Sequence, residues 1–183
     1  MVCLVPPLLA MVARWWFGTR VLATEGPRTC RAALDRWLPE PERPETARRA
    51  DETAHVIGFH LWRHAQREWQ QTDARSAMAR SRARRFGIIA PPFAVVIATF
   101  ALIVGKMHLL GAFAMVIAAI ALAALCTTLT LAGELRAVTN TANRLRKART
   151  FTNQDDEQAV VRCAMAHAWH QSLPPVLRWL QGG

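Results

Sequence analysis

Charge is almost absent from the middle of this 183-residue sequence, because residues 86–133 contain Lys106 as their single charged residue. Segregation this strong excludes an ordinary soluble globular domain and a disordered tail. The flanks are basic: residues 14–85 carry 15 basic and 9 acidic residues, and residues 134–183 carry 7 and 4. The sequence therefore predicts an all-α integral membrane protein with basic flanks.

Signatures of several enzyme classes are also missing. The four cysteines form no CxxC pair, so we interpret them as free thiols. There is no glycine-rich phosphate loop, no dinucleotide-binding fingerprint and no nucleophile motif. The net charge of +10 is not accompanied by a recognisable nucleic-acid-binding module, so we do not expect a nucleic acid as a partner.

Two uncharged stretches predict a transmembrane hairpin over residues 87–133. Residues 87–105 and 109–133 can each span the bilayer, since a helix needs about 20 apolar residues to cross it. Only Lys106, Met107 and His108 separate them. Pro91 and Pro92 predict a bend near the start of the first span, because proline removes a helical hydrogen bond.

The N-terminal residues 1–20 predict a further membrane anchor. Arg14 follows the apolar run rather than preceding it, which is not the order of a cleaved secretory signal. Trp15, Trp16 and Phe17 are typical of residues at the membrane interface. Whether residues 2–17 cross the bilayer completely is left open.

The arginines predict the orientation of the chain. The hairpin turn holds one of the 23 basic residues, so the positive-inside rule places residues 21–86 and 134–183 in the cytoplasm as helical segments. Arg80, Arg82, Arg84 and Arg85, here called the arginine collar, precede the first span and predict contact with an anionic inner leaflet. The alanine-rich second span is suited to close packing against another helix, which includes a helix of another membrane protein.

Helical patterns continue on both sides of the hairpin. We expect a short helix around residues 29–38, and a long one from Pro44 through Ala79. After the second span, residues 134–149 predict a continuation of the same helix. Thr152 or Asn153 is expected to cap a last helix, whose first turn is acidic.

A weak metal-binding pattern lies in the long predicted helix. His60 and His64 are four residues apart, so both imidazoles project from one face and can share a divalent metal ion. The alternative is a pair of surface or interface histidines. In zincins a Glu after the first His is the general base, but Leu61 stands there.

Glu134 is the candidate third metal ligand. It follows the second span, where a carboxylate is costly unless it is partnered or bound to a metal. The alternative is an ion pair with Arg136 or with the arginine collar. Glu68 is a weaker candidate ligand, because three successive turns of one helix do not converge easily on one ion.

The sequence resembles the YugP-like family of predicted neutral zinc metallopeptidases of bacterial membranes. The resemblance lies in the order anchor, HxxxH segment, hairpin and acidic-capped tail, and in residues 60–65, 130–137 and 155–164. It implies a zinc cofactor bound by His60, His64 and Glu134, in a bacterial inner membrane. Leu61 replaces the family's catalytic Glu, Arg63 replaces a Gly, and no Pro precedes the second motif.

These departures lead to two hypotheses of function. The first is a zinc-metallopeptidase-like membrane protein that binds metal but has little or no hydrolase activity, a pseudoenzyme, since leucine cannot accept a proton. The second is a non-catalytic structural or partner-binding membrane protein without metal.

Overall fold

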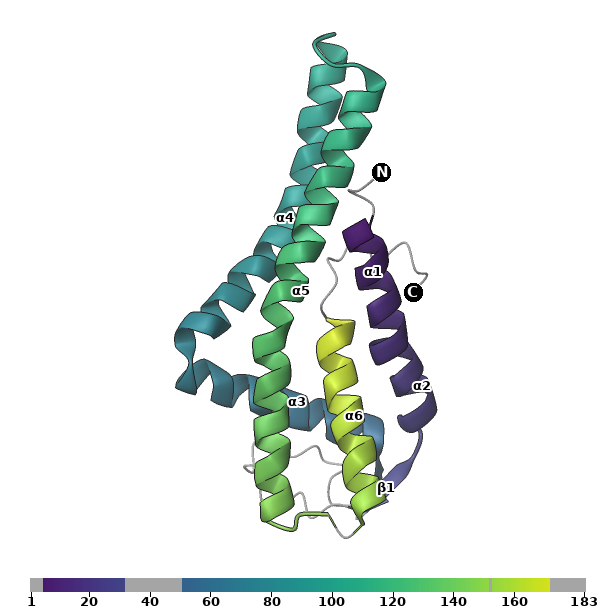
Figure 1. Cartoon of the computed structure of the whole chain (residues 1–183), viewed down its shortest axis with the longest axis vertical. Coiled ribbons are helices and arrows are strands. Elements are labelled where there is room, and N and C mark those ends of the chain that lie inside the picture. Colours follow the sequence, from purple (N-terminus) through teal and green to yellow (C-terminus); the bar gives the residue numbers. More distant parts are fainter. Residues whose placement is uncertain (1–4, 32–50, 152, 172–183) are drawn as a thin grey trace.

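A computed structural model describes residues 5–31, 51–151 and 153–171, and most of these residues are helical (Figure 1). The elements are α1 (Val5–Arg14), the π-helix η2 (Trp15–Thr19), α2 (Arg20–Glu25), β1 (Thr29–Arg31), β2 (Asp51–Thr53), α3 (Ala54–Thr72), α4 (Ala74–Ile103), α5 (Leu109–Lys147) and α6 (Gln154–His170). The predicted helical class is confirmed, with one exception: β1 and β2 form a short antiparallel ribbon in which Cys30 pairs with Glu52.

The helical hairpin is confirmed as the antiparallel pair α4 and α5, and its insertion in a membrane stays a prediction. Within the described residues, these are the helices long and apolar enough to cross a membrane. Gly105 supplies a left-handed residue, with φ of 69°, at the turn between them. Figure 1 shows the tip of the hairpin projecting beyond the other helices, and α4 bending along its length. Pro91 and Pro92 lie inside α4, as the expected bend requires.

Small side chains hold the two hairpin helices together. Ala94 and Ala98 of α4 and Ala112 and Ala121 of α5 are buried. Large apolar side chains instead face outward from the pair: Ile88, Ile89, Phe93, Val96, Phe100, Ile103, Leu109, Leu110, Phe113, Leu122, Leu125 and Leu129 are exposed. The predicted close packing of the alanine-rich span is thus confirmed within the chain itself.

The main core lies where α3 crosses α5 and α6. Ile57 and Leu61 of α3 and Val160 of α6 are each 0% exposed, and Leu131 and Val138 of α5 complete the contact. Figure 1 shows α3 running across the long axes of α5 and α6.

The helices α1, η2 and α2 follow one another without a break and lie beside α6 (Figure 1). The guanidinium of Arg14 lies 3.0 Å from Nε2 of His170, and the ring of Phe17 stacks on that of Trp169. This segment is not one of the helices long and apolar enough to span a membrane. Residues 1–4 lie outside the described residues, so the predicted anchor stays a prediction.

Two predicted helices have different bounds. Residues 29–31 are a strand rather than the start of a helix, and 32–38 lie outside the described residues. The start predicted for the long helix at Pro44 lies outside the described residues. Residues 51–53 are a strand, and the helix α3 begins after it at Ala54. It then stops at Thr72: Asp73 has φ of −134°, and its Oδ1 accepts a bond from the Ser76 backbone N–H at 3.2 Å, which starts α4.

The C-terminal predictions are confirmed. α5 continues unbroken from the hairpin to Lys147. The Asn153 side chain accepts a bond from the Asp155 N–H at the start of α6. Cys30, Cys126 and Cys163 are free thiols, and Cys3 lies outside the described residues.

Candidate functional site

The carboxylate of Glu134 lies where α3, α4 and α5 meet, and its residue is 1% exposed. Arg80 Nε of α4 donates to Oε2 at 2.8 Å. From α3, Trp62 Nε1 donates to Oε1 at 2.7 Å, and Gln66 Nε2 donates to the same oxygen at 3.4 Å. Both oxygens of Glu134 are therefore occupied by donors of the protein itself.

Arg80 is 2% exposed and joins α4 to α5. Its Nη1 donates to the Thr127 carbonyl oxygen, and to Thr130 Oγ1 at 3.2 Å. Its Nη2 is buried and has no hydrogen-bond partner among the described residues. The predicted alternative for Glu134, an ion pair with the arginine collar, is confirmed, and the partner is Arg80 rather than Arg136.

The structure does not bring the three predicted metal ligands together. His60 and His64 each lie two residues from Trp62, so each is roughly 160° around α3 from the side chain that contacts Glu134. Within the described residues, no three His, Cys, Asp or Glu side chains form a group that could hold a metal ion. Zinc binding stays a prediction, and His60, His64 and Glu134 offer no shared site for it.

The acid that affects the pKa of His60 is Glu52 rather than Glu134. Burial lowers the pKa of its imidazole, Glu52 of β2 opposes that shift, and Arg63 adds to it. Both carboxylate oxygens of Glu52 are buried and have no hydrogen-bond partner in the described part of the chain. Sequence reasoning missed this burial, because no periodicity marks a three-residue strand.

Leu61 occupies the position that the resemblance assigns to a catalytic base. Its side chain is fully buried in the core between α3, α5 and α6. This place on α3 therefore faces packed side chains rather than an open cavity. A general base there would have no access to water or substrate.

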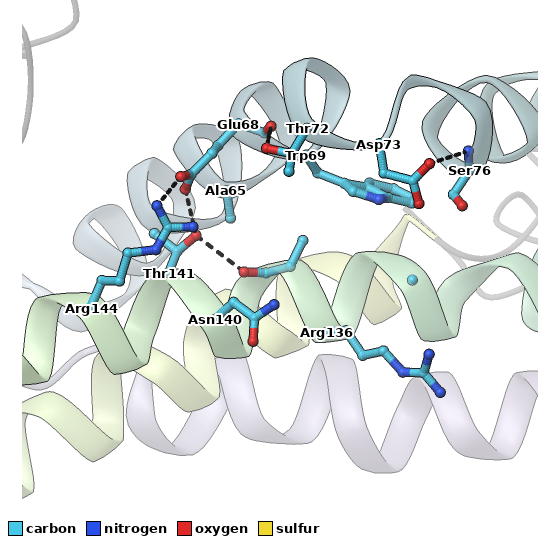
Figure 2. Close-up of a pocket in the computed structure, with 12 residues that line it drawn as sticks. Ala65, Glu68, Trp69, Thr72, Asp73, Ser76, Arg136, Asn140, Thr141 and Arg144 are labelled. Carbon is cyan, nitrogen blue, oxygen red and sulfur yellow. Dashed lines mark hydrogen bonds and ion pairs between the residues drawn. The ribbon is translucent and has the colours of Figure 1, made fainter.

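A cavity of about 280 Å³ lies between α3 and α5, here called the α3–α5 cavity (Figure 2). Glu68, the weaker candidate ligand, lines it and forms an ion pair with Arg144. Thr141 Oγ1 donates to the other Glu68 oxygen at 3.2 Å. Figure 2 shows Arg136 pointing away from Glu68. Glu68 is thus already neutralised, and Asp73, the other acid that lines this cavity, accepts a hydrogen bond from the Ser76 backbone N–H.

A second cavity, of about 250 Å³, lies in the angle between α3 and α4 and is called the α3–α4 cavity. Trp69 lines both cavities. The described residues lining the second one include no acid; they are Gln66, Trp69, Gln70, Ala77, Arg80, Ser81, Arg84, Arg85 and Ile88. Its polar lining is therefore basic and neutral.

An aromatic cluster buries His167 of α6. The rings of His55 and Phe59 lie 4.7 and 5.5 Å from its ring, measured between centroids. Its Nε2 lies 3.2 Å from the His55 carbonyl oxygen and donates to it as the neutral imidazole. Burial lowers the pKa of His167 to about 4.

Protein-family models, curated proteins and solved structures were compared with the chain, and none of them matches it. The similarity to zinc metallopeptidases therefore stands on the residues quoted for it alone.

Proposed function

We propose that this chain is a non-catalytic membrane protein, which anchors a small basic helical domain at the inner face of a bacterial plasma membrane. In this proposal the apolar parts of α4 and α5 cross the bilayer. The parts of both helices that lie away from the hairpin turn, with α3 and α6, form the cytoplasmic domain. Its role is structural, and its first partner is the anionic lipid surface.

The packing of the hairpin supports insertion. Water-soluble helices bury large apolar side chains, whereas the apolar parts of α4 and α5, up to Leu129, bury alanines and expose Phe, Leu, Ile and Val. Membrane helices commonly pack through small residues, because lipid solvates the large ones. The exposed Phe93, Phe100 and Phe113 would face acyl chains.

The arrangement of Glu134 favours the non-catalytic function over the metallopeptidase-like one. Its two oxygens accept three hydrogen bonds, and the charge of Arg80 neutralises it at 2.8 Å. Releasing this carboxylate to a metal would leave a buried arginine without its counter-ion, which costs several kcal/mol. This occupied carboxylate is the observation that carries the proposal.

Metal content tests the proposal directly. The full chain, purified in detergent, is loaded with excess zinc, dialysed and analysed by elemental mass spectrometry. We expect zinc well below one ion per chain, and the same melting temperature with and without a chelator. A double variant, His60→Ala with His64→Ala, should give the same zinc content, as should the control His108→Ala in the hairpin turn.

Near-stoichiometric zinc that disappears in the double variant and persists in His108→Ala would overturn the non-catalytic proposal. The metallopeptidase-like function would then be the better one, with ligands other than Glu134.

A further inference from the structure

We infer that the α3–α4 cavity is a binding site for a phosphate group, and specifically for the phosphodiester of an anionic phospholipid. The lipid as the source of that phosphate rests on the proposed function, since it requires the hairpin to be in the membrane. The recognition chemistry does not depend on it.

The charge of the cavity points to an anion. Arg84 and Arg85 line it beside Arg80, and the described lining residues include no carboxylate. Glu134 balances the charge of Arg80, and Arg84 donates to the neutral Gln171, so the charges of Arg84 and Arg85 have no acid beside them in the lining. Arg85 is exposed and forms no ion pair with any described residue. The planar guanidinium matches the geometry of phosphate oxygens and donates two parallel hydrogen bonds.

Arg80 provides a second, independent observation. Its Nε and Nη1 are committed to Glu134, Thr127 and Thr130, but Nη2 is buried and unpartnered among the described residues. A buried donor without an acceptor costs about 1–3 kcal/mol. An anion in the cavity that Arg80 lines would supply the missing acceptor.

The position of the cavity beside the start of the apolar run of α4 points to a lipid. Arg85 is the last charged residue before the apolar run of α4, and Ile88, one turn further into that run, lines the same cavity. Ser81, Gln66 and Gln70 add neutral donors. The lining therefore combines basic and neutral polar side chains with the apolar Ile88, which suits a headgroup phosphate attached to acyl chains.

Binding to the detergent-solubilised full chain tests the site. The probes are dioctanoyl phosphatidylglycerol and inorganic phosphate, titrated separately and followed by calorimetry. We expect saturable binding of the lipid at one site. Arg85→Gln should weaken it about tenfold, as expected for losing one charge-assisted hydrogen bond.

Arg82→Gln is the matched control. It removes the same charge from the arginine collar three residues away, but Arg82 contacts Met78 and does not line this cavity. A second pair uses α3: Gln70→Glu places a negative charge in the lining, whereas Gln71→Glu places it on an exposed position outside it. We expect binding to fall in the first variant of each pair only.

Each outcome decides the proposal. Lipid binding that depends on Arg85 and Gln70 supports the phospholipid, and inorganic phosphate binding with the same dependence identifies free phosphate as the source. Equal losses in Arg85→Gln and Arg82→Gln, or no saturable binding of either probe, would overturn the site. The proposed membrane function would survive that failure if a membrane-impermeant maleimide still labels Lys106→Cys in the hairpin turn from outside the cell.

Discussion

At the scale of single residues, the ion pair of Arg80 and Glu134 connects α4 to α5, and Glu134 also binds α3. Each is almost fully buried, and together they connect α3, α4 and α5 through hydrogen bonds to Trp62, Thr127 and Gln66. A buried ion pair is not a large source of net stability, but either charge alone in the same place is strongly unfavourable.

Single substitutions of this pair should therefore destabilise the chain more than the double substitution does. We expect Glu134→Leu or Arg80→Met to lower the free energy of unfolding by about 3–5 kcal/mol. The double variant should recover a large part of that loss. Unfolding by urea in mild detergent, followed by circular dichroism, measures all four chains.

The exposed pair of Glu68 and Arg144 is the control for this cycle. Arg144→Gln should cost no more than about 1 kcal/mol, because solvent screens that pair. Additive losses in the Arg80 and Glu134 double variant would contradict the coupling.

His167 gives the fold a pH dependence. Its folded pKa of about 4 lies below the ordinary value of 6.5 for histidine, so the unfolded chain binds more protons between these pH values. The free energy of unfolding should therefore fall as the pH is lowered from about 6.5 to about 4. Above pH 6.5 the contribution of neutral His167 to stability is fully present. The burial of His60 acts in the same direction.

Melting temperatures measured from pH 8 to pH 4 test this. His167→Gln keeps a donor for the His55 carbonyl but cannot titrate, so its stability should depend less steeply on pH below 6.5. If the melting temperature of this variant falls with decreasing pH as steeply as that of the unaltered chain, other groups cause the loss of stability in acid.

At the scale of elements, the close crossing of α3 and α6 depends on a glycine. A β-carbon added at Gly58 would lie 2.6 Å from the Cys163 β-carbon and 3.0 Å from the Val160 carbonyl oxygen. Backbone on α6 stands in the way, so a side chain at this position requires the two helices to move apart.

We expect Gly58→Ala to destabilise the chain by about 1–3 kcal/mol, because overpacking outweighs the gain in helix propensity. Gly18→Ala is the control, since its β-carbon would meet its nearest neighbours at 3.5 Å, an ordinary contact. Chemical unfolding of the two variants should separate them, and a Gly58→Ala chain as stable as Gly18→Ala would refute the tight crossing.

At the scale of the whole molecule, the hairpin turn lies at one end of the long axis, and the end of α5 and the start of α6 lie at the other (Figure 1). The turn residue Lys106 and the loop residue Asn153 are both exposed. If α4 and α5 cross the bilayer, the lipid lies between these positions. The positive-inside rule predicts that Asn153 then lies on the cytoplasmic side.

Cysteine labelling in intact bacteria should report this topology. A membrane-impermeant maleimide should label Lys106→Cys from outside, and Asn153→Cys only after the cells are opened. The unaltered chain is the background control: burial raises the pKa of Cys30 to about 11 and of Cys163 to about 12, so neither is a reactive thiolate. Labelling of Asn153→Cys in intact cells would reverse the proposed orientation.

The sequence by itself determined the elements whose signals are local. Uncharged runs of sufficient length gave the hairpin, the three residues between them gave its turn, and Asn153 with its acidic followers gave the start of α6. These signals need no knowledge of the rest of the chain, because hydropathy, helix period and capping act over a few residues.

Only the tertiary structure decided what the polar residues do. The helical period puts His60 and His64 on one face of α3 and Trp62 on the other, but nothing in it says which face meets α5. That choice follows from how α3 crosses α5 and α6, which depends on packing between distant residues. Arg80 and Glu134 are 54 residues apart, and a pairing over such a separation leaves no periodic mark in the sequence.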